Sequence, residues 1–259
     1  MTQTLEAFAD QLYTAELKKQ SVSPLIEQRS DLTIEDAYRI QMLVLDRKLA
    51  AGARVVGKKT GLTSQAMQQM LQVNRPDFGH LTDGMVYEGA VAVPVKDFLQ
   101  PRVEPEIAFV LKKDLKGPGV TVADVMRATD YVVPALEVID SRIRDWKISI
   151  VDTIADNASS GGFVVGSPFK LAEGIDLRLV GMNFYVNGRL VSTATGAAVL
   201  GNPFVAVAWL ANALAPLDVA LRTGEIILSG SLCAAVPVTT GDSVLAMFDR
   251  LGSIGAFFE

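Results

Sequence analysis

Residues 102–111 read RVEPEIAFVL, so two glutamates directly precede a fully apolar run. In an extended chain, side chains two residues apart point to the same face, and we expect Glu104 and Glu106 to project side by side. The run that follows predicts a strand that is buried on both faces. Two carboxylates beside a buried strand cost free energy unless something neutralises them. A hard cation with oxygen ligands is one solution, and an exposed strand end where both glutamates meet water or Arg102 is the other.

A third carboxylate lies inside a second hydrophobic run, residues 131–140, which read YVVPALEVID. Glutamate is rarely buried in such a run without a partner, so Glu137 also needs a cation. Together with the first two glutamates it would form a site for an octahedral Mg²⁺ or Mn²⁺ ion that leaves positions open for water or substrate. The alternative is a buried ion pair between Glu137 and Arg142 or Arg144.

Short β-rich runs surround these two segments and predict a mostly β body from about residue 84 onward. Gly, Pro, Asp or Asn bound the runs, which are residues 90–93, 107–111, 131–139, 163–165 and 226–228. Met182, Phe184 and Val186 alternate with polar or aromatic neighbours before Asn187-Gly188. This dipeptide predicts a type I′ hairpin, because both of its residues tolerate positive φ.

The first 80 residues carry helical signals. The apolar residues at helical spacing are Leu5, Phe8, Leu12 and Tyr13. A second helix is expected to begin at Thr33 with a capping-box-like sequence and to end at Gly52, and a third, short helix is expected over residues 63–72. We therefore expect an α+β fold, with a helical N-terminal lobe over residues 1–80 and a mixed, β-rich catalytic domain over residues 81–259.

One long segment, residues 190–217, contains no charged side chain. Gly201-Asn202-Pro203 interrupts it and leaves residues 204–214 as the longest purely apolar piece. That piece is too short to span a bilayer, which requires about 20 apolar residues. We expect a buried helix capped by Asn202 that ends near Pro216, and no membrane association.

Composition and charge narrow the classes of partner and compartment. The chain is 49% apolar and 20% charged, which is ordinary for a globular protein. Its net charge of −5 argues against nucleic-acid binding, which needs concentrated Lys and Arg. The N-terminal residues lack the features of a signal peptide, and the single cysteine, Cys233, cannot form an intrachain disulfide. We interpret Cys233 as a buried structural thiol, with a reactive nucleophile as the alternative, and expect a cytoplasmic protein.

Three further polar features could carry chemistry. Residues 57–64, GKKTGLTS, could hold an anionic carboxylate at a helix start or form a simple basic turn, and their order is not that of a P-loop. Residues 156–162, DNASSGG, predict a turn that could present N–H groups and hydroxyls to a ligand. His80 is the only histidine, and we interpret it as a surface or turn residue because no nucleophile elbow accompanies it. General acid–base catalysis would then require carboxylates, lysine or metal-bound water.

Taken together, these segments resemble the fumarylacetoacetate hydrolase superfamily. They are similar to its bacterial 2-hydroxypenta-2,4-dienoate (2-oxopent-4-enoate) hydratase branch, which serves the meta-cleavage degradation of aromatic compounds. The resemblance runs nearly end to end. Its carriers are GKKTGLTS (57–64), RPDFG (75–79), QPRVEPE (100–106), PALEVIDSRIRDW (134–146) and ADNAS (155–159).

The resemblance implies a lyase that binds Mg²⁺ or Mn²⁺ through Glu104, Glu106 and Glu137. The substrate would chelate the metal through its carboxylate and 2-oxygen, and the metal would act as a Lewis acid. Water would add at C4 of 2-hydroxypenta-2,4-dienoate and give 4-hydroxy-2-oxopentanoate.

The resemblance also implies roles for four side chains. Lys59 would bind the substrate carboxylate or move a proton, with a pKa that would fall in a partly buried cationic site. Asp77 would act as the base for water. Ser159 or Ser160 would bind the carboxylate or polarise water.

Other readings stay open at this point. The related 4-oxalocrotonate decarboxylases share the fold and the metal glutamates, but Asp77 and Asp145-Trp146 favour the hydratase. Thr60 and Asn202-Pro203 depart from the branch pattern and could alter the shape of the pocket. A hydrolase that cleaves a C–C bond in an acylpyruvate would need a His–Glu pair, for which His80 is not obviously placed.

A further reading is a non-catalytic subunit that binds the companion decarboxylase. The resemblance implies a homo-oligomer, and a complex with 4-oxalocrotonate decarboxylase. The apolar helix at residues 204–214 suits burial in a core or in such an interface.

Overall fold

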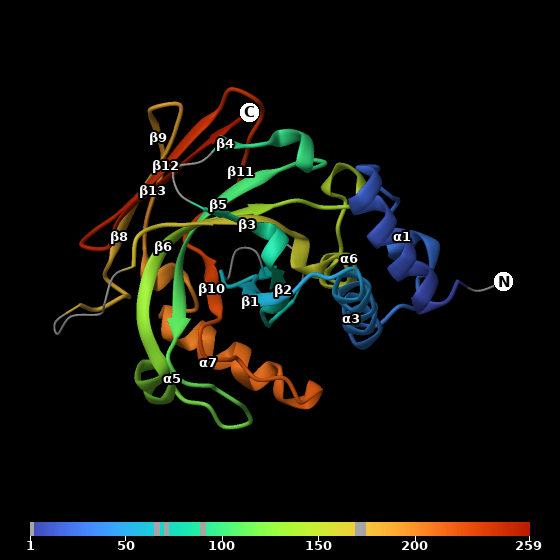
Figure 1. Cartoon of the computed structure of the whole chain (residues 1–259), viewed down its shortest axis with the longest axis horizontal. Helices are drawn as coiled ribbons and strands as arrows, with labels where there is room; N and C mark the ends of the chain where they lie inside the picture. The colour runs from blue at the N-terminus through green and yellow to red at the C-terminus, as the bar shows by residue number, and fades with distance from the viewer. Residues whose placement is uncertain (1–2, 65–67, 70–72, 89–91, 169–174) are drawn as a thin grey trace.

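A large mixed sheet runs through the centre of the molecule (Figure 1). The computed structural model describes residues 3–64, 68–69, 73–88, 92–168 and 175–259. Within these residues the larger sheet has eight strands, in the order β2-β1-β10-β5-β6-β7-β3 with β11 paired to β5. Its strands are β1 (Val55–Gly61), β2 (Asp77–Thr82), β3 (Val86–Glu88), β5 (Arg102–Leu111), β6 (Thr129–Ile139), β7 (Ser160–Val165), β10 (Ile226–Ser231) and β11 (Val236–Pro237). The predicted buried strands at residues 107–111 and 131–139 are therefore confirmed as parts of β5 and β6, which are antiparallel neighbours.

A smaller sheet lies beside the larger one. In the described part of the chain it has five strands in the order β4-β13-β12-β8-β9. They are β4 (Ala92–Val93), β8 (Gly181–Val186), β9 (Arg189–Thr195), β12 (Ser243–Phe248) and β13 (Gly252–Phe258). Strands β8 and β9 form an antiparallel hairpin in which Asn187 and Gly188 both have positive φ, 51° and 74°. The predicted hairpin turn is confirmed.

The N-terminal helices pack together at one side of the larger sheet (Figure 1). They are α1 (Leu5–Lys18), α2 (Leu25–Gln28) and α3 (Ile34–Ala50), and they share a hydrophobic cluster with α6 (Ile150–Ala155). Thr33 and Asp36 form the expected capping box of α3. The helical region is shorter than predicted, because β1 and β2 already belong to the larger sheet. A domain boundary at residue 80 would fall inside β2. The helix expected at 63–72 lies mostly outside the described residues.

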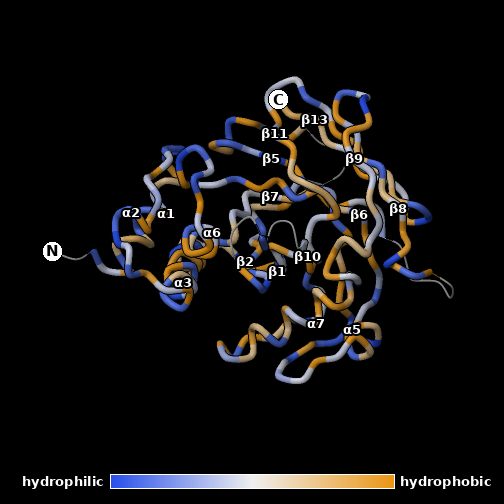
Figure 2. The backbone as a smooth tube through the Cα atoms, turned by 180° about the vertical axis from the view of Figure 1, so that it is seen from behind, coloured by the Kyte–Doolittle hydropathy of each residue, from blue (hydrophilic) through white to orange (hydrophobic). Residues whose placement is uncertain are grey.

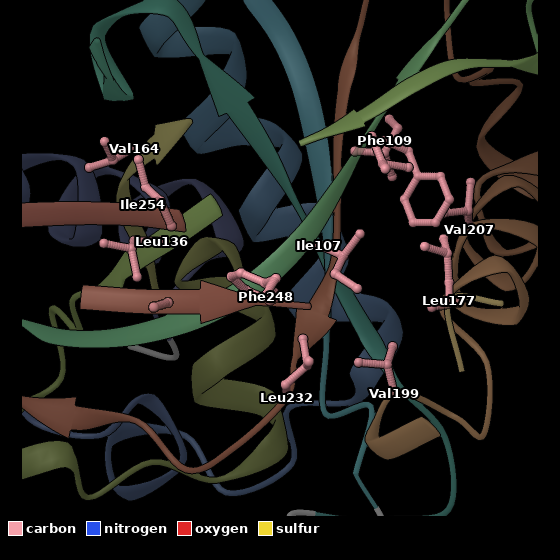
Figure 3. Packing of buried hydrophobic residues seen from close by; sticks show 14 of the residues in the cluster. Ile107, Phe109, Leu136, Val164, Leu177, Val199, Val207, Leu232, Phe248 and Ile254 are labelled. Atoms are coloured by element: carbon pink, nitrogen blue, oxygen red, sulfur yellow. The ribbon is translucent and has the colours of Figure 1, made fainter. Parts of the chain in front are cut away.

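The main core fills the space between the two sheets and α7 (Pro203–Ala213). Figure 3 shows Ile107 and Phe109 of β5 in this core, with the Phe109 ring directed toward Val207 of α7. Phe109 also meets Phe204 edge to face, with ring centroids 5.2 Å apart. The opposite face of the larger sheet carries a separate apolar cluster, which lies next to the functional side chains described below. Its buried members are Leu81, Met85, Ala108, Val133, Ala135, Phe163 and Leu228.

Helix α7 is the expected apolar helix. Asn202 caps it by accepting a hydrogen bond from the Phe204 N–H, and Pro203 occupies its first turn. Among the described residues, Gly196–Leu217 is long and apolar enough to cross a membrane by length and composition, and half of it is buried inside the protein. Only 11 of these residues form α7, which is coloured largely as hydrophobic in Figure 2. Its buried side chains belong to the main core, as expected of a core helix.

Candidate metal centre

Three glutamates converge at one end of the β5–β6 pair. Glu104 on β5 is directly opposite Glu137 on β6, and Glu106 follows two residues along β5 on the same face. One carboxylate oxygen from each glutamate lies within 4.8 Å of those from the other two. The structure therefore brings together the side chains that the sequence singled out.

Two of the three glutamates are fully buried, Glu104 is partly exposed, and the cluster is short of hydrogen-bond donors. Glu106 and Glu137 are 1% and 0% exposed. Burial and the charge of Glu137 raise the pKa of Glu104 to about 7 and that of Glu106 well above its ordinary value, although Lys59 opposes both shifts. Glu106 Oε1 and Glu137 Oε2 accept no hydrogen bond from the described residues. Unsatisfied buried carboxylate oxygens are costly, so the cluster needs another positive charge.

Lys59 on β1 is the cation that points into the cluster. Its Nζ lies 3.1 Å from Glu137 Oε2 and donates a hydrogen bond of 3.0 Å to the Ala158 carbonyl oxygen. Burial alone would lower the pKa of Lys59, but Glu137, Asp77 and the two other glutamates outweigh it and raise the pKa above its ordinary value. The site is anionic, so the pKa moves opposite to the expectation from sequence. One ammonium faces four carboxylates, and an all-oxygen cluster of this kind fits a hard divalent cation.

A bulge in β10 supplies a backbone hydrogen bond to Glu106. The register of β10 with β5 shifts between Leu228 and Ser231, and the Gly230 N–H donates to Glu106 Oε2 at 2.8 Å. Gly230 has a φ of +113°, and a Cβ there would lie 2.3 Å from Thr63 Oγ1. Only glycine fits this position without displacement, which fixes the orientation of the Glu106 carboxylate.

Asp77 lies beside Lys59 at the edge of the same cluster. It pairs with Gly61 across β1 and β2. A Cβ on Gly61 would lie 2.2 Å from Asp77 Oδ1 and 3.6 Å from Lys59 Nζ, so both groups occupy the space over this glycine. Burial raises the pKa of Asp77 to about 6, Lys59 lowers it and Glu137 raises it further. Asp77 Oδ1 accepts no hydrogen bond from the described residues and is therefore available to a ligand.

A strained turn presents the two candidate serines. Asn157, Ala158 and Ser159 form the short helix η4 (Asn157–Ser159) with φ of 57°, 50° and 53°. Three consecutive non-glycine residues in this region store strain of the kind found at functional sites. Ser160 Oγ donates to Glu137 Oε1 at 2.8 Å, and Ser159 Oγ lies 3.2 Å from Thr153 Oγ1. The turn thus holds one metal-ligand candidate and leaves the Ser159 hydroxyl beside a second hydroxyl.

Arg142 holds this turn in place through hydrogen bonds. Its buried guanidinium donates to Asp156 Oδ1 and to the backbone carbonyls of Asp140, Asp156 and Ser160. The alternative that Glu137 pairs with Arg142 is therefore wrong, because Arg142 pairs with Asp156. Sequence reasoning missed this role, and it also missed Thr153 and Gly230. The only signal was the position of Arg142 shortly after the Glu137 strand.

Two sequence interpretations need correction. His80 is 3% exposed. It lies directly across from Lys58 in the β1–β2 ladder, so its side chain points to the face of the sheet opposite Lys59. It is not a surface histidine, and burial and Lys58 lower its pKa to about 4. Cys233 is partly rather than fully buried, and burial raises the pKa of its thiol to about 11. A thiol of this kind is a poor nucleophile at neutral pH.

Comparisons with known proteins show the family to which the chain belongs. A family model described as fumarylacetoacetate (FAA) hydrolase C-terminal matches residues 54–257. The chain is 53% identical to a 2-hydroxypent-2,4-dienoate hydratase of Pseudomonas putida over 83% of this chain and 98% of that protein. It is 46% identical to a 2-hydroxyhexa-2,4-dienoate hydratase of Comamonas testosteroni over 99% of this chain and 98% of that one.

A solved structure of a related enzyme has the same fold as this chain. The 4-oxalocrotonate decarboxylase of Pseudomonas putida G7, complexed with magnesium and adipate, superposes with a TM-score of 0.95 at 38% identity. The match covers 98% of this chain and 97% of the decarboxylase. The fold and the carboxylate cluster define an enzyme of the fumarylacetoacetate hydrolase type. The chain belongs to the fumarylacetoacetate hydrolase family, and its curated relatives above are hydratases.

Proposed function

We propose that this enzyme is a divalent-metal-dependent hydratase that adds water to 2-hydroxypenta-2,4-dienoate (2-oxopent-4-enoate) to give 4-hydroxy-2-oxopentanoate. The convergence of three glutamates, in which Glu106 Oε1 and Glu137 Oε2 accept no hydrogen bond from the described residues, carries the proposal. The hydratase relatives support the reaction, since they cover most of the chain at 46–53% identity. The reaction belongs to the meta-cleavage degradation of aromatic compounds.

Glu104, Glu106 and Glu137 would hold Mg²⁺ or Mn²⁺. Both ions prefer carboxylate oxygens in octahedral geometry, which leaves positions for substrate oxygens and water. When bound, the ion would act as a Lewis acid on the 2-oxo acid. Ser160 would orient the Glu137 carboxylate, because its hydroxyl donates to the Oε1 atom.

Lys59 would balance the charge of the ligands and of the arriving substrate carboxylate. Its pKa is raised, so it remains an ammonium and cannot act as a base near neutral pH. Asp77 is the better base for water, since its pKa of about 6 lies close to the working pH and its Oδ1 is free of partners within the described residues. Ser159 would donate to the substrate or to the attacking water. These roles assign the proton transfer to a carboxylate and the anion binding to a lysine.

The decarboxylase reading is the second candidate. Its support is the decarboxylase structure that this chain matches at 38% identity, which is lower than the identity to the two hydratases. A C–C hydrolase that activates water through a His–Glu pair is disfavoured, because His80 faces away from the glutamates. A non-catalytic subunit is disfavoured because the carboxylate cluster is complete.

The decisive experiment follows the hydration of freshly generated dienol by purified enzyme, with EDTA and with added Mg²⁺ or Mn²⁺. We expect hydration to require the metal, and Glu106→Gln to weaken metal binding. Equal rates with EDTA and with metal would refute the proposal. Supplying 2-oxohex-3-enedioate and measuring CO₂ separates the two reactions, and release as fast as dienoate hydration would favour the decarboxylase.

We also propose a homo-oligomer in the cytoplasm that associates with 4-oxalocrotonate decarboxylase. A single cysteine suits a reducing compartment. Association would pass a reactive dienol between the two enzymes without release. Light scattering of the enzyme alone and mixed with the decarboxylase tests both assemblies, and a monomer under both conditions would contradict them.

A further inference from the structure

Arg102 is a cation held in a fixed place at the outer end of the glutamate row. Its guanidinium carbon lies 4.6 Å from the centroid of the Trp146 ring, in a cation–π contact. Trp146 is itself anchored, because its Nε1–H donates to the Gln100 carbonyl oxygen at 3.0 Å. A stacked guanidinium loses most of its side-chain freedom before any ligand arrives, which favours binding of an anion.

Arg102 lies on the same face of β5 as the metal-ligand candidates. The register of β5 with β6 is continuous from Arg102 through Glu106, so Arg102, Glu104 and Glu106 project to one side. Its charge acts on Glu104, where it lowers the carboxyl pKa against the larger effect of burial. Two residues along a strand correspond to about 6.6 Å, a distance that about five carbon–carbon bonds span.

The Arg102 guanidinium is without a salt bridge in the part of the chain that the structure describes. Among the residues that the structure describes, no carboxylate forms a salt bridge with Arg102, and its side-chain N–H groups donate no hydrogen bond. The residue is only partly exposed. The buried Arg142, by contrast, donates to four acceptor atoms. Arg102 therefore presents an unused bidentate donor beside the site.

The backbone that places Trp146 is strained. Asp145 and Trp146 have φ of 58° and 54° within the short helix η3 (Arg144–Trp146). A bulky aromatic residue rarely adopts this conformation, and such strain persists at binding sites where the surrounding structure enforces it. The strain here sets the tryptophan ring under Arg102.

We propose that Arg102 is a second anion-binding point of the site and takes a carboxylate at the end of the substrate remote from its 2-oxo acid. The inference rests on the proposed function and extends the substrate class to 2-oxo-4-enedioic acids of about seven carbons. The carboxylate beside the 2-oxo group would lie at the glutamate cluster. It therefore could not contact Arg102 at the same time, and a second carboxylate is needed. The planar fork of arginine matches a carboxylate through two parallel hydrogen bonds.

The test compares kcat/KM for 2-oxopent-4-enoate with that for 2-oxohept-4-ene-1,7-dioate, in the metal-loaded enzyme and its variants. We expect Arg102→Gln to lower the dioate-to-monoacid ratio by about 10- to 100-fold, mainly through KM, because a charge-assisted hydrogen-bond pair is lost. Arg102→Lys should retain part of the ratio. Arg144→Gln is the matched control, since Arg144 is exposed and lies in η3, which also contains Trp146. This variant should leave the ratio unchanged.

A binding measurement separates this inference from the proposed function. Adipate and hexanoate are titrated into metal-loaded protein while the fluorescence of its two tryptophans is followed, of which Trp146 lies beside Arg102 and Trp209 lies in α7. We expect adipate to bind more tightly than hexanoate, and Arg102→Gln to abolish the difference. Equal affinities in the wild-type protein, an unchanged ratio in Arg102→Gln, or equal losses on both substrates would overturn the inference. If the metal-loaded wild-type enzyme hydrated neither acid but still bound adipate more tightly than hexanoate, the hydratase proposal would be refuted and the inference about Arg102 would stand.

Discussion

Glu104 and Glu137 face each other directly across the β5–β6 pair, although like charges in that position destabilise a sheet. Burial makes the arrangement more costly, and burial together with the charge of Glu137 raises the pKa of Glu104. The single ammonium of Lys59 approaches Glu137 and leaves the cluster anionic. A bound divalent cation would remove the conflict, so the metal should contribute to stability as well as to catalysis.

Metal should raise the melting temperature of the protein. A ligand that binds only the folded state at 100 times its Kd adds about 2.7 kcal/mol, which for a chain of this length corresponds to about 5–10 °C. Differential scanning fluorimetry with EDTA and then with saturating Mg²⁺ or Mn²⁺ measures the shift. Glu106→Gln should fold and lose most of it. A full shift in that variant would remove Glu106 from the ligand set.

Metal-free protein should lose stability as the pH rises from about 4.5 to 7. The folded pKa of Glu104 is about 7 against an ordinary value of 4.5, so the folded state retains a proton that the unfolded state has released. The slope of unfolding free energy with pH is therefore negative in this window. Glu104→Gln cannot ionise, and it should gain about 2 kcal/mol relative to the wild type between pH 5 and 8, after allowance for solvent screening.

Urea unfolding in EDTA at several pH values gives this difference directly. Excess Mg²⁺ should abolish or reverse it, because metal binding requires the ionised carboxylates. A wild-type protein that becomes more stable relative to Glu104→Gln with rising pH in EDTA would contradict the expectation.

The metal site was the most predictable part of the molecule, because its signal is local. Glu104 and Glu106 share a face through the two-residue period of a strand, and Glu137 lies inside an apolar run. The sequence could place all three near buried strands without any knowledge of pairing. It could not align them, since the register that sets Glu104 opposite Glu137 is a property of two strands together.

Strands β1 and β2 were missed for a physical reason. The stretch around Lys58 and Lys59 looks too polar for a buried strand, yet both lysines are 3% exposed. Each lysine is neutralised by a distant carboxylate: Lys58 Nζ lies 2.7 Å from Glu225 Oε1, and Lys59 Nζ lies 3.1 Å from Glu137 Oε2. Such partners are invisible in a local pattern. The partner of Arg142 is also invisible in a local pattern, because the sequence does not show that Asp156 and the turn after it fold back onto this arginine.

Arg142 should act as a positioning residue for the strained turn. Arg142→Met would leave Asp156 buried and unpaired, at a cost of about 3–5 kcal/mol, and is expected to impair folding. Arg142→Lys keeps the charge but cannot reach both the carboxylate and the backbone carbonyls. We expect it to fold with lower stability, to lower kcat, and to reduce the metal-dependent rise in melting temperature, because Ser160 and the Ala158 carbonyl would shift.

Arg178→Lys is the matched control for that experiment. Arg178 pairs with Asp176 on the surface, where an ion pair contributes about 0–1 kcal/mol. It should change neither kcat nor the metal-dependent shift. An Arg142→Lys enzyme with both properties unaltered would show that the turn holds its shape without the guanidinium.

His80 should be dispensable for the chemistry, although it is the only histidine. It faces away from Lys59 and the glutamates, its Nδ1 has no partner within the described residues, and its pKa of about 4 keeps it neutral. We expect His80→Phe to retain hydration within about threefold, since the aromatic ring fills a similar volume and removes an unsatisfied polar atom. The pH dependence of kcat/KM should also be unchanged, with the acidic limb set by Asp77 near pH 6. Loss of that limb in His80→Phe, or its persistence in Asp77→Asn, would shift the base from the aspartate to the histidine and revive the hydrolase reading.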